Sequence, residues 1–170
     1  GINIAASATY TMFDGFGWYN GATDVNNFPI YPDESLIFRN GTGTQQILVQ
    51  SGSVPMVPFH TVLSLVNPGT SQDIRLTSGL PVDITLQEFV DAGASSNGDQ
   101  ILLFSNAATG KNKAASLTAV YYDGYGWYNG ATDVNSHVIP SGQGFIYRKA
   151  AGNTSDIVVN LTPAYQSNGN

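Results

Sequence analysis

Short runs of β-branched and aromatic residues, separated by Gly, Asn, Asp and Pro, dominate the pattern of hydrophobic and polar positions along this chain. Such runs predict short strands joined by tight turns. Asp-Gly and Asn-Gly pairs between them are strong hairpin signals. The predicted strands are 8–13, 17–19, 35–39, 45–50, 61–66, 73–76, 99–104, 117–122, 126–128, 144–148 and 156–160.

A single helix is predicted near 85–92. Thr85 is a plausible N-cap, Glu88 three residues later completes a capping box, and Gly93 ends the helix. The run 99–104 is the most apolar of the predicted strands, so we expect it at the centre of a sheet.

The chain contains an internal repeat. Residues 14–26 return as 123–135, with 12 of 13 positions identical, and the offset of 109 continues upstream and downstream. An internal repeat of this kind indicates that a structural unit is duplicated within the chain. We expect an all-β, β-sandwich-like fold with two duplicated β-meander units, either sharing one core or forming two subdomains. Unit 1 covers 1–50, a central segment with the short helix covers 51–113, and unit 2 with a C-terminal tail covers 114–170.

The repeat predicts an open edge on unit 1. The strand 99–104 precedes unit 2, whereas Gly1 aligns with Gly110, so unit 1 has no equivalent strand. Exposed strand edges are covered in most proteins. The covering strand could come from the central segment, from another copy of the chain or from a missing N-terminal portion. The candidate assembly residues are Ala8, Tyr10, Met12, Ile101 and Leu103.

The composition narrows the function classes. Charged residues make up 11% of the chain and the net charge is −6, which disfavours nucleic acid and anionic membranes as partners. No run of eighteen apolar residues predicts a membrane span. Cysteine is absent, which excludes disulfides and thiolate chemistry. A chain rich in Gly, Asn, Ser and Thr is typical of extracellular or cell-surface proteins, and the start at Gly1 suggests a removed leader or longer N-terminal part.

Several short motifs resemble an uncharacterised family of secreted, β-rich proteins typical of Verrucomicrobia-like bacteria. The motifs lie at 81–86, 98–103, 114–116, 121–124, 127, 139–145 and 148–149. The resemblance implies a secreted β protein. The family has no assigned activity, so it implies no catalytic residue or cofactor.

Candidate chemistry is sparse. Oxygen ligands in Gly-rich loops suit calcium, although turn formation explains the same residues: Asp14, Asp24, Asp123 and Asp133. Paired aromatic residues beside Asn-Gly could contact a glycan or pack in each unit: Trp18, Tyr19, Trp127 and Tyr128. Arg39 and Arg148 end matching strands, either exposed or paired with carboxylates such as Asp24, Asp33 or Asp133. His60 and His137 do not match each other, and no nucleophile-elbow sequence is present.

The sequence therefore favours a non-enzymatic extracellular structural protein without a cofactor. We expect a filament or surface-layer subunit that self-associates through β-strand complementation. The alternative is a secreted carbohydrate-binding or adhesion module that binds polysaccharide through the duplicated Trp-Tyr loops. A hydrolase built on scattered Asp and Ser is the least favoured hypothesis.

Overall fold

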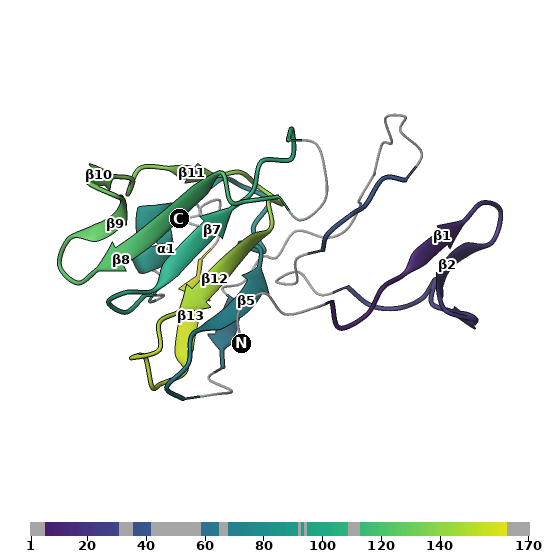
Figure 1. The fold of residues 1–170 in the computed structure, drawn as a ribbon, viewed down its shortest axis with the longest axis horizontal. Helices are drawn as coiled ribbons and strands as arrows, with labels where there is room; N and C mark the ends of the chain where they lie inside the picture. Colours follow the sequence, from purple (N-terminus) through teal and green to yellow (C-terminus); the bar gives the residue numbers. More distant parts are fainter. Residues whose placement is uncertain are drawn as a thin grey trace, which may run out of the picture.

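The computed structural model describes residues 6–30, 36–41, 59–64, 68–91, 93, 95–108 and 113–162. It confirms the all-β fold, with antiparallel sheets and one short helix (Figure 1). The elements before the helix are β1 (Thr11–Phe13), β2 (Gly17–Asn20), β3 (Thr23–Asp24), β4 (Phe59–Leu63), β5 (Gln72–Leu76) and β6 (Ile84–Thr85). The helix and the strands after it are α1 (Leu86–Asp91), β7 (Gln100–Leu103), β8 (Leu117–Tyr122), β9 (Gly126–Asn129), β10 (Thr132–Asp133), β11 (Val138–Ile139), β12 (Phe145–Lys149) and β13 (Ile157–Leu161).

A six-stranded sheet in the order β10-β9-β8-β7-β12-β5 forms the main body of the protein. Strand β7 pairs antiparallel with β8 on one side and with β12 on the other, which confirms the central place expected for 99–104. The central segment therefore does not merely connect the units, because β5 and β7 are strands of the sheet of unit 2 and β4 pairs with β13.

One face of this sheet forms the core. Its inward side chains share one buried cluster with α1 and with the β4–β13 ribbon, so the helix and the ribbon together form the second layer. The members contributed by the sheet are Leu76, Ile101, Leu103, Ala119, Trp127, Phe145 and Tyr147. Those contributed by the second layer include Leu63, Leu86, Phe89, Ile157, Val159 and Leu161.

The helix begins with the predicted capping box. The backbone N–H of Thr85 donates to Glu88 Oε2 at 2.6 Å, and the N–H of Glu88 donates to Thr85 Oγ1 at 3.2 Å. Gly93 follows with a φ of 94°, a conformation that glycine adopts without strain, and its N–H donates to the carbonyl of Val90. Both ends of the helix are thus capped by residues close to it in the sequence.

Unit 1 differs from the prediction at its second half. Residues 36–40 do not form the expected strand, whereas their equivalents in unit 2 form β12. Strand β12 is held by β7 and β5 on its two sides. No such neighbour pairs with 36–40 in the described part of the chain, so the same sequence pattern stays irregular there. The predicted strand 45–50 lies outside the described residues.

The hairpin of unit 1 lies apart from the main body (Figure 1). Strands β1, β2 and β3 form a separate three-stranded sheet, and β1 pairs only with β2 among the described strands. The exposed edge predicted for unit 1 is thus on β1.

Candidate assembly surface

The two copies of the repeat have the same local structure. In unit 1, Met12 lies opposite Trp18, and in unit 2 the equivalent Tyr121 lies opposite Trp127. Strand β3 pairs antiparallel with β2, and β10 pairs with β9 in the equivalent register. The hairpin therefore forms from its own sequence, whatever packs against it.

In each hairpin, an asparagine side chain hydrogen-bonds to the backbone of the strand that carries the tryptophan. Asn26 Oδ1 accepts the backbone N–H of Trp18 at 2.8 Å, and Asn135 Oδ1 accepts that of Trp127 at 2.7 Å. A Cβ at Gly17, or at Gly126 in unit 2, would overlap the side-chain amide of this asparagine. The identity of the repeat at these positions is explained by this closure.

The carboxylates proposed as calcium ligands support the same loops. Asp24 Oδ1 accepts the N–H of Asn26 at 2.8 Å, and Asp133 Oδ1 accepts that of Asn135 at 2.8 Å. Asp14 and Asp123 lie in the turns that follow β1 and β8. The described residues hold no group of three or more His, Asp or Glu placed to bind a metal ion. Calcium binding stays an untested expectation.

The two units differ sharply in burial at equivalent positions. Trp127 is 0% exposed and Trp18 is 36% exposed. Tyr147 is 0% exposed, whereas Phe38, which takes its place in unit 1, is 53% exposed. Further exposed apolar side chains of unit 1 are Met12, Phe13, Phe16, Phe28, Ile30, Leu36 and Ile37. A concentration of exposed large apolar side chains in one unit is a candidate interaction site.

The predicted assembly residues lie in different surroundings: Met12 is exposed, Ala8 and Tyr10 are half-buried, and Ile101 and Leu103 are in the core of the main body. Ala8, Tyr10 and Met12 correspond to Leu117, Ala119 and Tyr121 of unit 2. In the sheet, Leu117 lies opposite Leu103 and Ala119 opposite Ile101. Among the described strands, none pairs with residues 8 and 10 in the same way.

Several side chains of this surface were not identified from the sequence as site residues, among them Ile30, Leu36 and Phe38. The offset of 109 makes them the equivalents of Ile139, Phe145 and Tyr147, but only the structure shows that those three are buried. Phe38 packs against Trp18, with ring centroids 6.3 Å apart. Phe38 therefore places segment 36–39 beside the hairpin, next to Trp18.

The proposed glycan contacts are not equivalent in the two units. Trp127 lies in the core, with its ring 5.3 Å from that of Tyr121, so a sugar cannot reach its faces. Trp18 is accessible and Tyr19 is half-buried. Tyr128 is half-buried beside Tyr122. Of the two tryptophans, only Trp18 of unit 1 offers an accessible ring.

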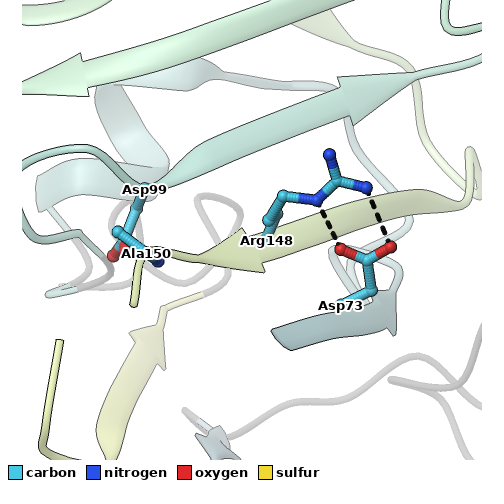
Figure 2. A network of polar contacts seen from close by, with 4 residues as sticks. All are labelled: Asp73, Asp99, Arg148 and Ala150. Atoms are coloured by element: carbon cyan, nitrogen blue, oxygen red, sulfur yellow. Dashed lines mark hydrogen bonds and ion pairs between the residues drawn. The ribbon is translucent and has the colours of Figure 1, made fainter. Parts of the chain in front are cut away.

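A polar network anchors the main sheet. Arg148 forms a bidentate ion pair with Asp73 at 2.6 and 3.0 Å, between neighbouring strands (Figure 2). Two alternatives were open for Arg148, an exposed strand end or an ion pair with a carboxylate such as Asp133. The structure shows an ion pair, but with Asp73, because β5 brings Asp73 directly opposite. The Asp73 hydrogen bonds raise the pKa of Arg148. Arg39, its equivalent in unit 1, is exposed.

A second polar cluster joins the start of β7 to the end of β12. Asp99 is buried and accepts the backbone N–H of Ala150 at 2.8 Å (Figure 2). It also accepts the hydroxyl of Tyr147. Burial of the ring, together with the Asp99 charge, raises the pKa of Tyr147 well above its ordinary value of 10.0. Burial lowers the pKa of Lys149, whose ammonium donates to the carbonyl of Ser155 at 2.5 Å. These charges are satisfied within the fold.

The histidines do not form a catalytic group. His60 Nδ1 pairs with Asn160 Oδ1 across β4 and β13. His137 lines a surface depression of about 540 Å³ together with hydroxyl and amide side chains of Ser105, Ser116, Ser141 and Gln143. No carboxylate lines this depression among the described residues.

Comparison with protein-family models, with curated proteins and with solved structures gave no match for this chain. The resemblance to secreted Verrucomicrobia-like proteins stays a prediction. In the part of the chain that the structure describes, no helix has the length and apolar character needed to cross a membrane.

Proposed function

We propose that this chain is a non-enzymatic structural subunit of an extracellular filament or surface layer, and that unit 1 joins it to its neighbour by accepting β-structure. One observation carries the proposal. In unit 2 the first strand of the repeat pairs with β7, whereas in unit 1 β1 pairs only with β2 among the described strands and several apolar side chains are exposed. An open edge beside an apolar face is a template for strand addition.

Sedimentation and negative-stain electron microscopy of the full chain test this role. We expect concentration-dependent association of the full chain, and its loss when residues 1–13, which include β1, are deleted. Unit 2 should stay folded in that variant, because its core contains no residue of unit 1. An unchanged assembly after the deletion would contradict the proposal.

Point variants give a matched control. Tyr10, the equivalent of buried Ala119, is half-buried, whereas the neighbouring Thr9 is exposed. A carboxylate that must be buried without a partner is costly. We expect Tyr10→Asp to prevent association and Thr9→Asp to leave it intact. Equal effects of the two variants would show that the added negative charge, and not the particular position of Tyr10, governs association.

A carbohydrate-binding role is the second candidate, because Trp18 remains accessible beside Asn20 and Tyr19. Trp127 cannot contribute, so such a module would have one site rather than two. Binding of soluble polysaccharides by the full chain and by Trp18→Ala tests it. Retained binding in Trp18→Ala would remove this candidate.

A further inference from the structure

We propose that the tip of each hairpin binds a neutral polysaccharide of β-linked pyranose units through three aromatic rings. We call these rings the tip cluster: Tyr122, Tyr125 and Tyr128 in unit 2, and their equivalents Phe13, Phe16 and Tyr19 in unit 1. The inference adds a binding activity to the proposed structural role, and it does not use Trp18.

The tip cluster of unit 2 lies on the outer face of the main sheet, opposite the core. Trp127 points into the core, so the next residue of the strand, Tyr128, points outward. Tyr122 lies opposite Gly126 and shares this outer face, with its ring 6.0 Å from that of Tyr128. Tyr125 lies in the turn between the strands, where its N–H donates to the carbonyl of Tyr122 at 3.0 Å.

Unit 1 repeats this arrangement. The rings of Phe13 and Tyr19 lie 5.9 Å apart, and they meet edge to face like their equivalents in unit 2. The N–H of Phe16 donates to the carbonyl of Phe13 at 3.0 Å. The three side chains line a shallow depression of about 260 Å³. Three rings therefore gather at the tip of the hairpin.

The exposure of these rings is the same in both units. Phe16 and Tyr125 are each 73% exposed, and Phe13 and Tyr122 are 49% and 45% exposed. The tryptophans of the same hairpins, by contrast, differ in exposure because different residues pack on their face. The exposure of the tip cluster thus belongs to the hairpin itself, and exposed aromatic surface that is present twice is a candidate binding site.

The two clusters share aromatic rings but not hydroxyl groups, because phenylalanine replaces tyrosine at two of the three positions. A ligand that both clusters bind is therefore recognised through contact with the ring faces. A pyranose whose hydroxyls are all equatorial has two apolar C–H faces and a rim of hydroxyls. Such a sugar ring matches an aromatic face in shape and polarity.

A carboxylate lies beside each cluster. Asp133 is directly opposite Tyr128, and Asp24 is directly opposite Tyr19, so each shares a face with the ring. Both aspartates are exposed, and each uses Oδ1 to accept the N–H of its loop asparagine. The second carboxylate oxygen has no hydrogen bond within the described residues, so it can accept one from a sugar hydroxyl. These carboxylates and the net charge of −6 disfavour an anionic polymer.

The size of the cluster also favours a sugar over a protein partner. At roughly 200 Å² for each aromatic side chain, the exposed part of the cluster is about 300 Å². A stable protein interface needs about 800 Å² from each partner. A polysaccharide repeats the same small epitope, so two clusters in one chain strengthen its binding through multivalency.

Calorimetry with cellohexaose and affinity electrophoresis in hydroxyethylcellulose, both on the full chain, test the proposal. We expect two cellohexaose molecules to bind per chain, and the chain to be retarded by hydroxyethylcellulose but not by polygalacturonate. If neither neutral probe binds, the proposal is overturned.

Variants at the turn position assign the sites. Tyr125→Ser should reduce the stoichiometry from two to one, and the double variant Phe16→Ser/Tyr125→Ser should bind hydroxyethylcellulose at least about tenfold more weakly. Tyr125→Phe should bind like the unchanged chain, because unit 1 already has phenylalanine there. Val158→Ser is the control, since it removes an exposed apolar side chain from β13. Circular dichroism should show that every variant is folded.

Three results would overturn the site. Unchanged binding in the double variant would place the sugar elsewhere, and loss of binding in Trp18→Ala would place it on Trp18. Equal loss in Tyr125→Phe and Tyr125→Ser would mean that the hydroxyl, and not the ring face, is recognised.

The structural role can fail separately from the sugar site. A chain that binds cellohexaose but does not associate would refute the filament role and leave the tip cluster assigned. A double variant that neither binds sugar nor loses association would show that the two roles use different surfaces. If the unchanged chain ignores both neutral probes and the double variant no longer associates, the tip cluster is a contact between copies of the chain and the sugar site is wrong.

Discussion

Replacement of Trp127 by alanine measures how much the buried tryptophan of unit 2 contributes to the stability of the main body. Trp127 is 0% exposed and lies in the core cluster. A tryptophan buries about 150–250 Å², which at about 25 cal/mol per Å² corresponds to about 4–6 kcal/mol. Measured losses for core Trp→Ala changes are about 3–5 kcal/mol, so we expect the free energy of unfolding to fall by about 4 kcal/mol.

Urea unfolding followed by far-ultraviolet circular dichroism is the assay, because it does not depend on tryptophan fluorescence. With a slope of about 2 kcal/mol per molar urea, the midpoint should fall by about 2 M. Trp18→Ala is the matched control from unit 1. It should change the same transition by less than about 0.5 kcal/mol, because Trp18 is outside the core cluster.

Two results would refute this reasoning. A loss below about 1 kcal/mol for Trp127→Ala would mean that the ring is not packed as the structure shows. Equal losses for Trp18→Ala and Trp127→Ala would mean that unit 1 is covered in the isolated chain. If Trp127→Ala does not fold, Trp127→Phe keeps an aromatic ring and should show a smaller loss in the same direction.

Two further predictions concern the helix and the buried polar cluster. Glu88→Ala removes the acceptor of the Thr85 N–H and should cost about 1 kcal/mol in urea unfolding, whereas Gln87→Ala, on the same helix but outside the capping box, should cost less. The raised pKa of Tyr147 means that the folded state keeps its proton above pH 10.0 while the unfolded state loses it, so stability falls as pH rises beyond that value. Tyr147→Phe should flatten this alkaline loss in unfolding measured between neutral pH and pH above 10.0, and an unchanged slope would show that Tyr147 ionises equally in both states.

The local features were predictable because they depend on residues close in sequence. The capping box of α1 needs only Thr85 and Glu88, and each hairpin is closed by an asparagine from its own loop. The apolar run 99–104 indicated a central strand because only a strand covered on both sides can bury such a pattern. The asparagine closure appears in both units because both contain the same loop sequence.

The partners of distant strands were not predictable. Asp73 and Arg148 are 75 residues apart, and only the pairing of β5 with β12 brings them together. Segment 35–39 had the pattern of a strand, yet among the described strands none pairs with residues 36–39 in the way that β5 and β7 pair with β12. A strand gains its hydrogen bonds from other strands, so its pattern alone does not decide whether it forms.

The sequence by itself determined the all-β class, the duplication and the closed hairpins, because these follow from short-range pattern and turn chemistry. The tertiary structure alone decided that Trp127 is a core residue while Trp18 is exposed. The two share nearly identical surroundings in sequence, so their difference comes from what packs against each ring. Around Trp127, the strands and the helix of the central segment are held in place by long-range strand pairing, which the repeat sequence alone does not specify.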